Sequence, residues 1–304
     1  MKKTLKRSAI LITSLLIIVL IWGICEPFFI KIEREKAFIP NLPKVWENET
    51  IAVIGDFQVG MWMDNTKTVK RAAEKVVELN PGIVLILGDF LYHPETESEA
   101  KMKAVTQLLQ PLVSADIPVF TVLGNHDYGM NDLQDAPKTK IATRLELKLE
   151  NLGITVLQNE TMSLLKTNEN ITVGEPSPHS LYLAGIGATW AERAYPKKVF
   201  QHIPDALPRV VMMHNPDAFK KIPAQLAPLA IAGHTHGSQI NIPYFSTWLF
   251  KTVLKDEKVH SSGWIKGFGS NGNRLYINRG IGFSNVPIRI NCPPEITVFE
   301  LLRG

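Results

Sequence analysis

The sequence of 304 residues is poor in cysteine and has no long block of like charge. Its two cysteines, Cys25 and Cys292, form no CxxC pair, so we expect neither a cysteine zinc site nor a disulfide framework. A chain of this length buries a large core and needs no such cross-links. The formal net charge is +4 and no block of five like charges occurs, so nucleic acid is not indicated as a required partner. Internal repeats and low-complexity segments are also absent from the sequence.

The N-terminus combines a basic flank with an apolar run. Four basic residues within the first seven positions precede an uncharged stretch from Ala9 to Cys25. Its 17 residues lie at the lower limit for a membrane-spanning helix. A cleaved signal peptide and an uncleaved signal-anchor both fit, and the missing small residues of a cleavage site favour the anchor. Residues 1–30 are therefore predicted as a single-pass anchor in the cell membrane. The basic flank places the remainder outside the cytoplasm, although three basic residues within 31–36 weaken that orientation.

Beyond the anchor, we expect a linker over residues 31–50 and one domain over residues 51–304. Proline, asparagine and charged residues dominate positions 38–49, which is typical of a linker. The domain then begins with alternating patterns. Short apolar runs at 51–54, 83–87 and 118–123 alternate with stretches of helical spacing at 64–79, 97–113 and 135–152. This alternation predicts βαβ units and a parallel sheet.

After Gly153 the apolar runs become shorter and are separated by polar turns. We expect a second, more antiparallel set of strands there. Two sets of strands, each followed by helices, predict an α/β fold in which two mixed β-sheets lie face to face between layers of helices.

Polar clusters follow the predicted strands at the points where those strands end. In parallel sheets the carboxyl ends of the strands share one edge, where ligands bind. Each cluster alone is weak evidence, but the set supplies carboxylate, amide and imidazole groups together. Buried carboxylates need partners, and divalent cations suit all of these groups. The clusters are Asp56–Gln58, Gly88–Asp89, Gly124–Asp127, the lone His214, and Gly233–His236.

The order of these motifs resembles the calcineurin-like metallophosphoesterase superfamily over roughly Ile51 to Leu302. Gly-His-Thr-His-Gly-Ser-Gln-Ile at 233–240 and the tail from 275 to 296 resemble its bacterial membrane-associated or exported branch, which has an N-terminal anchor. The resemblance implies a four-layer α/β/β/α sandwich. It also implies a dinuclear centre of two divalent metal ions, with Mn²⁺ favoured and Mg²⁺, Fe or Zn²⁺ possible.

Seven side chains correspond to metal ligands in this resemblance: Asp56, Gln58, Asp89, Asn125, His214, His234 and His236. Asp56 and His236 are expected at the first ion, and Asp89 is expected to bridge both ions. Asn125, His214 and His234 are expected to complete the second site. His126 is expected beside the substrate as general acid or hydrogen-bond donor, with Asp127 orienting it.

Gln58 departs from the family pattern, which has histidine at this position. Three interpretations remain open. Gln58 ligates through its amide oxygen and shifts the first site toward Mn²⁺ or Mg²⁺, or it only hydrogen-bonds a water or the substrate. In the third, the first site is degenerate and the protein is inactive.

The expected reaction is hydrolysis of a phosphomonoester or phosphodiester by attack of a dimetal-bound hydroxide. Two alternatives stay open. One is a membrane-surface hydrolase of a lipid-linked or nucleotide-sugar pyrophosphate, and the other is a non-catalytic binding module with the same fold. An aromatic-basic segment, residues 241–274, either contacts a membrane surface or completes the core. The sequence indicates no oligomeric state.

Overall fold

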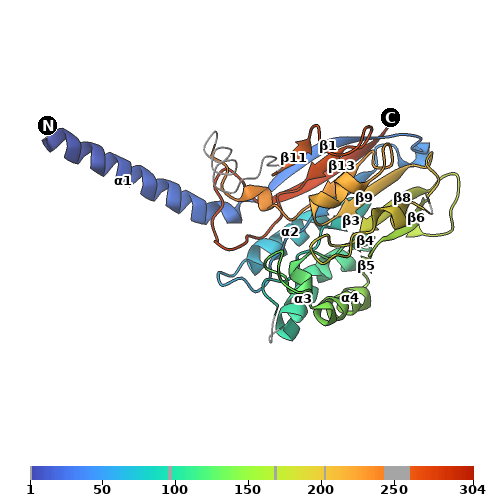
Figure 1. The fold of residues 1–304 in the computed structure, drawn as a ribbon, viewed down its shortest axis with the longest axis horizontal. Coiled ribbons are helices and arrows are strands. Elements are labelled where there is room, and N and C mark those ends of the chain that lie inside the picture. Colours follow the sequence, from blue (N-terminus) through green and yellow to red (C-terminus); the bar gives the residue numbers. More distant parts are fainter. Residues whose placement is uncertain (1, 95–97, 168–169, 202, 243–260) are drawn as a thin grey trace.

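The computed structural model describes residues 2–94, 98–167, 170–201, 203–242 and 261–304. Helix α1 (Lys2–Cys25) projects from one end of a domain built from two sheets (Figure 1). Its large apolar side chains are exposed to solvent along its length, for example Leu11 at 73%. The stretch Lys3–Phe28 is long and apolar enough to cross a membrane.

Among the described residues, the first sheet has six strands, and the last four in its strand order are parallel to one another. The strand order is β1 (Lys31–Ile39), β13 (Glu295–Arg303), β2 (Thr50–Ile54), β3 (Ile83–Ile86), β4 (Val119–Thr121), β5 (Thr155–Val156). Strand β13 runs antiparallel to β2, whereas β2 to β5 are parallel to one another. The outer face is covered by α2 (Thr66–Leu79), α3 (Ser98–Ser114) and α4 (Thr139–Leu152). These helices confirm the prediction of a helix in each of the three stretches of helical spacing.

The linker expected over residues 31–50 does not exist in that form. Lys31–Ile39 is strand β1, which pairs in parallel with β13 over its whole length. The 3₁₀ helix Lys44–Trp46 then buries Trp46 completely. Edge strands are commonly charged, which prevents them from pairing with other chains. The charged residues of β1 therefore resembled those of a linker, which explains why the strand was not predicted. The strand buries Ala37 and Ile39.

In the described part of the chain, the second sheet has seven strands and is parallel in its centre. The strand order is β11 (Gly263–Ile265), β12 (Leu275–Ile277), β10 (Ala230–Ala232), β9 (Arg209–Met213), β8 (Leu181–Ile186), β6 (Glu160–Lys166), β7 (Ile171–Val173). Within this sheet, antiparallel pairing occurs where β11 joins β12 and where β6 joins β8 and β7. The second half of the chain is thus less antiparallel than its short apolar runs suggested.

Three apolar layers hold the sandwich together. On β2, Val53 faces the second sheet, whereas Ala52 and Ile54 face the helices. This period of two explains why the central strands read as continuous apolar runs, since both faces of each strand are buried. The outer face of the second sheet packs against α5 (Pro196–Phe200) and the 3₁₀ helix Pro216–Lys221. The predicted arrangement of two face-to-face sheets flanked by helices is confirmed.

Part of the aromatic-basic segment, residues 243–260, lies outside the described residues. Two aromatic side chains of its described part belong to the packed structure. Trp264 on β11 packs edge-to-face with Tyr276 and Phe299, with ring centroids 5.4 and 5.9 Å away. Phe268 stacks on Phe219 at 6.1 Å. These two rings therefore agree with the interpretation that the segment completes the core.

Candidate metal centre

The predicted ligands lie in the loops that follow the carboxyl ends of five parallel strands. Asp56 and Gln58 follow β2, Asp89 follows β3 and Asn125 follows β4. In the second sheet, His214 follows β9, and His234 and His236 follow β10. All except the half-buried His234 are buried. The structure therefore brings all seven residues to one edge of the sandwich.

These loops turn sharply, so several ligands adopt an unusual backbone conformation. Left-handed φ angles cost non-glycine residues about 1–3 kcal/mol each and are concentrated at functional sites. Backbone hydrogen bonds hold the turns, including those from Asp56 N–H to Gly88 O and from Gln58 N–H to Asp89 O, both 2.9 Å. Five of the seven predicted ligands have positive φ: Asp56 (52°), Gln58 (52°), Asp89 (53°), His234 (72°) and His236 (49°).

Two of the motif glycines provide the space in which carboxylates lie. A Cβ atom at Gly233 would lie 2.7 Å from Asp56 Oδ2. One at Gly124 would collide with Asp89 Oδ1. The residues that precede Asn125 and His234 are therefore glycines because of crowding, within the first sheet at Gly124 and between the two sheets at Gly233.

Asp89 is at the centre of the cluster. Its Oδ2 lies 2.9 Å from Gln58 Nε2 and 3.3 Å from His214 Nε2. Two groups of three side chains have ligand atoms within 4.8 Å of one another, and Asp89 belongs to both. The first group contains Asp56 and His236, and the second contains His214 and His234. Asp89 thus occupies the position that a bridging carboxylate requires.

Asn125 and the histidines of the second group surround one point. His214 Nε2 lies 3.1 Å from Asn125 Oδ1 and 3.2 Å from His234 Nδ1. On the other side of its ring, His214 Nδ1 lies 2.8 Å from Leu87 O. Donation from Nδ1–H to that carbonyl orients the ring and turns Nε2 toward the other candidate ligands, as metal-binding histidines require.

Polar atoms without hydrogen-bond partners and shifted pKa values in the cluster both match a site for divalent ions. Among the described residues, the buried Gln58 Oε1 and His236 Nδ1 atoms have no hydrogen-bond partner. Burial raises the pKa of the Asp56 carboxyl to about 7. Burial also lowers the pKa of His234 to about 3, so that imidazole is neutral and able to ligate at neutral pH. Carboxylate, amide and imidazole donors together suit Mn²⁺, Mg²⁺, Fe or Zn²⁺, and the residues present fit a two-ion centre.

His126 lies beside the ligand cluster. Its backbone N–H donates to Asp89 Oδ1 at 2.9 Å. Its ring lines the cavity next to the cluster and stacks near the rings of Tyr92 and His93, at centroid distances of 5.8 and 6.0 Å. The buried His126 Nδ1 has no hydrogen-bond partner among the described residues. This position is compatible with proton transfer to a substrate.

Asp127 does not orient His126 as expected. Its carboxylate accepts the N–H groups of Asp89 (2.9 Å), Phe90 (2.8 Å) and Gly124 (2.8 Å). It is fully buried, and the left-handed turn at Asp89 points these amides toward it. Asp127 therefore holds the Asp89 loop in place and acts on the site through the backbone.

Arg289, which is not among the predicted site residues, is fully buried. Its guanidinium donates to the carbonyl oxygens of Arg279 (2.9 Å), Cys292 (3.0 Å) and His236 (3.4 Å), and also to Gly282. It thus joins the loop after β12 to the loop that carries His236. Its position between two isoleucines was the available signal, because an arginine in an apolar run is often buried with its donors satisfied.

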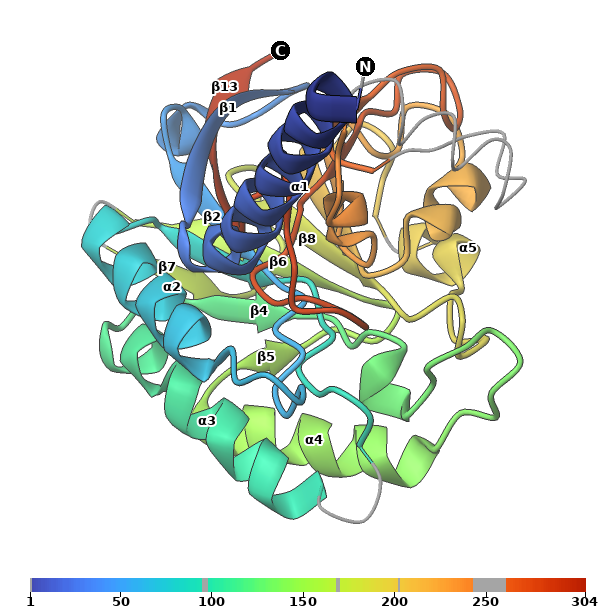
Figure 2. The ribbon, with the colours of Figure 1, turned by 90° about the vertical axis from the view of Figure 1, so that its left-hand side faces the viewer.

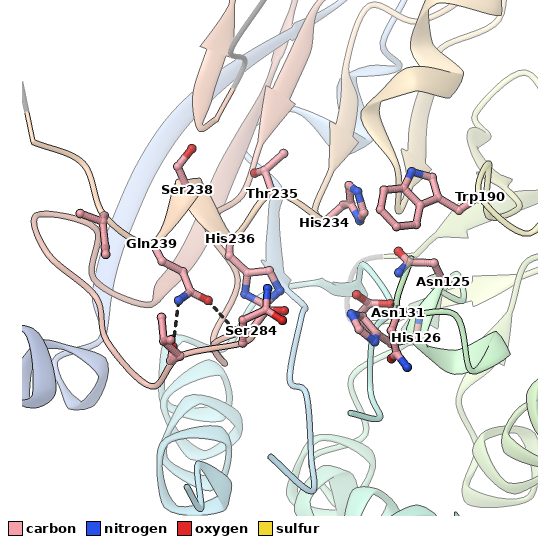
Figure 3. A pocket seen from close by; sticks show the side chains of 14 residues that line it. Asn125, His126, Asn131, Trp190, His234, Thr235, His236, Ser238, Gln239 and Ser284 are labelled. Atoms are coloured by element: carbon pink, nitrogen blue, oxygen red, sulfur yellow. Dashed lines mark hydrogen bonds between the residues drawn. The ribbon is translucent and has the colours of Figure 1, made fainter. Parts of the chain in front are cut away.

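A cavity of about 380 Å³ opens over the cluster. His236 and Gln239 lie on one side of it, and Asn125 and His126 lie on the other (Figure 3). Trp190, which the sequence did not single out, stands edge-on to His234 with ring centroids 4.7 Å apart. The remaining wall includes Ser284, Asn285 and Val286 from the loop after β12.

Residues 49–238, well over half of the chain, match the sequence model of the calcineurin-like phosphoesterase family. The chain belongs to this family. The superfamily suggested by the motifs is therefore confirmed, and the protein is a metal-dependent phosphoester hydrolase of a family that uses dinuclear centres.

Three curated relatives are similar to this phosphoesterase over most of its length. UDP-2,3-diacylglucosamine pyrophosphatase LpxG of Chlamydia muridarum is 26% identical over 91% of this chain and 91% of its own. Phosphodiesterase YaeI of Escherichia coli K12 is 28% identical over 74% and 72%. The uncharacterized metallophosphoesterase YkuE of Bacillus subtilis is 26% identical over 91% and 87%.

The unpartnered Oε1 of Gln58 makes a test of its role possible in this phosphoesterase. We expect Gln58→Leu to lower the affinity for the first ion about tenfold or more, since an amide oxygen donor is lost. Gln58→His should restore that affinity and shift it toward Zn²⁺. Metal titration of both variants measures this. Unchanged affinity in Gln58→Leu would leave only a hydrogen-bonding role, and a single ion per wild-type chain would indicate a degenerate first site.

Proposed function

We propose that this phosphoesterase hydrolyses a phosphoester or pyrophosphate bond in a substrate held at a membrane surface, with lipid-linked pyrophosphates as the first class. The supporting observation concerns the loop 284–292. One part of this loop walls the cavity, through Ser284, Asn285 and Val286. Another part holds the last turn of α1, where Arg289 N–H donates to Gly23 O at 2.9 Å. The same short loop thus connects the active-site cavity to the membrane helix.

The junction between α1 and this loop is hydrogen-bonded and closely packed. The buried Glu26 carboxylate accepts the N–H groups of Asn291 and Cys292 at 2.8 and 2.6 Å. Gly23 packs so closely on Ile288 that a Cβ atom would lie 2.7 Å from its Cγ2. Seen from the side on which α1 emerges, the helix crosses in front of the domain next to the loop after β12 (Figure 2). If α1 spans a bilayer, the cavity is fixed next to the surface of that bilayer.

The relatives bear on the choice of substrate. The name of LpxG specifies a diacylated pyrophosphate substrate, and its similarity to this chain extends over 91% of both proteins. The name of YaeI specifies only a phosphodiesterase. A soluble phosphomonoester or phosphodiester is therefore the second candidate. Anchoring through residues 1–30, with the catalytic domain outside the cytoplasm, forms part of the proposal.

The roles proposed for the side chains follow from their positions. The first ion is assigned to Asp56, Gln58 and His236, the second to Asn125, His214 and His234, and Asp89 is shared. When bound, two divalent ions polarise the phosphoryl group and acidify a water molecule. His126, whose side chain lines the cavity wall, supplies a proton to the substrate. Arg289 and Asp127 keep the loops in register, and Mn²⁺ is the favoured metal.

The test compares two substrate classes with the full chain in lipid nanodiscs loaded with Mn²⁺, Mg²⁺ or Zn²⁺. We expect kcat/KM for a lipid-linked pyrophosphate in the disc to exceed that for soluble bis-p-nitrophenyl phosphate by about 100-fold, since binding energy from the lipid part contributes only to the first. Equal turnover of the soluble ester in the presence and absence of lipid would favour the second candidate. Less than one ion per two chains after Mn²⁺ loading would indicate a non-catalytic module.

A further inference from the structure

Large apolar side chains are exposed around the base of α1. Trp22 and Phe29 are 51% and 56% exposed and stack on each other at 5.8 Å. Trp62 is 71% exposed and belongs to the loop that begins at the predicted ligands Asp56 and Gln58. Val286, 45% exposed, belongs to the cavity wall. Contiguous exposed apolar surface on a folded protein marks an interaction site.

Val286 lines the cavity, and Trp62 lies next to this part of the wall through its contact with Asn285; we call these two side chains the rim. Trp62 Nε1–H donates to the carbonyl of Asn285 at 3.4 Å, so the two loops touch beside the cavity mouth. Gln239 Nε2 donates to the carbonyl of Val286 at 3.0 Å, which fixes this part of the loop to the cavity wall (Figure 3). The rim is therefore a defined surface that connects the metal loop to the loop that holds α1.

The depth of the rim follows from its connection to the helix. Gly23, which contacts Ile288, lies two residues before the end of the apolar run at Cys25. At 1.5 Å per residue, this contact is about 3 Å inside the end of that run.

We propose that the rim, Trp62 and Val286, inserts into the interfacial layer of the bilayer and forms the edge over which the lipid part of the substrate reaches the cavity. This inference rests on the proposed function, because it requires α1 to span the membrane. Tryptophan suits this position, since its apolar ring and N–H group match the boundary between headgroups and acyl chains. A bilayer, rather than a protein, is the partner because the rim adjoins a helix that is itself exposed and apolar.

The rim can be tested by comparing Trp62→Ser with a matched variant, Leu147→Ser. Leu147 is 52% exposed on α4, which lies far from α1 in both ribbon views (Figures 1 and 2). In lipid nanodiscs, we expect Trp62→Ser to lower kcat/KM for a disc-held lipid pyrophosphate about ten times more than for bis-p-nitrophenyl phosphate. Trp62→Phe should recover much of this loss, and Leu147→Ser should lower both values equally.

Quenching of tryptophan fluorescence by brominated lipids provides a readout that is independent of activity. We expect the quenched fraction to fall in Trp62→Phe relative to the wild type. The proposal would be contradicted if the quenched fraction stayed unchanged and Trp62→Ser and Leu147→Ser had equal kcat/KM values. If Trp62→Ser disrupts a dimer of the wild type while the quenched fraction stays unchanged, the rim contacts a second copy of this chain. This result would also overturn the proposal. If the wild type shows no preference for disc-held substrate, the proposed function fails and quenching alone decides whether the rim contacts lipid.

Discussion

Replacing Asp89 by alanine is expected to remove both the bound metal and turnover. Asp89 is common to both groups of ligand atoms, and the attraction of His214 and His126 keeps its pKa below the usual value despite the opposing effect of burial. Loss of a shared carboxylate removes several kcal/mol of charge stabilisation in the transition state. This corresponds to a rate decrease of roughly 10³-fold or more. Metal analysis of the purified variant and turnover of a chromogenic diester measure the two effects.

The Asp89→Asn variant separates charge from shape. Its side chain can still accept the backbone N–H of His126 and fits beside Gly124, so the loop should keep its structure. We expect weak metal retention and low turnover in a folded protein, as judged by an unchanged thermal transition. Full occupancy of both ions in either Asp89 variant would refute the assignment of Asp89 as the shared ligand.

Replacing His126 by alanine is expected to lower kcat by roughly 10²–10⁴-fold while both ions stay bound, as for loss of a general acid. His126 contacts Asp89 through its backbone N–H, which alanine retains. Its ring belongs to neither group of candidate ligand atoms, so metal binding does not depend on it. Turnover and metal content should therefore respond differently.

His93→Ala serves as the control for His126, because the His93 ring stacks 6.0 Å from the His126 ring without lying in the ligand cluster. We expect a much smaller decrease in kcat for His93→Ala. Unchanged turnover in His126→Ala would exclude this residue from the mechanism, and loss of metal would show that it has a structural role instead.

Much of the fold could be read from local patterns. The apolar runs at 51–54 and 83–87 correspond to β2 and β3, and the helical spacing at 64–79 corresponds to α2. These predictions succeeded because the spacing of apolar residues within one element is set by that element alone. The clusters at strand ends converged because parallel strands end at one edge. Strand β1 was missed because its charges resembled those of a linker, and only its pairing with β13, more than 250 residues away, shows it to be a strand.

Residue types and their positions at strand ends indicated a site for divalent ions, and the resemblance of the motif order to a known family indicated a two-ion phosphoesterase. The partner of each group depended on the tertiary structure. Asp127 binds the amides of the Asp89 loop rather than His126, and Arg289 holds carbonyls of three separate segments. The contact of α1 with loop 288–292 joins the first and last parts of the chain. Several of these contacts, such as Asp127 with the Asp89 amide and Arg289 with the His236 carbonyl, link residues far apart in sequence, so only packing of the whole domain determines them.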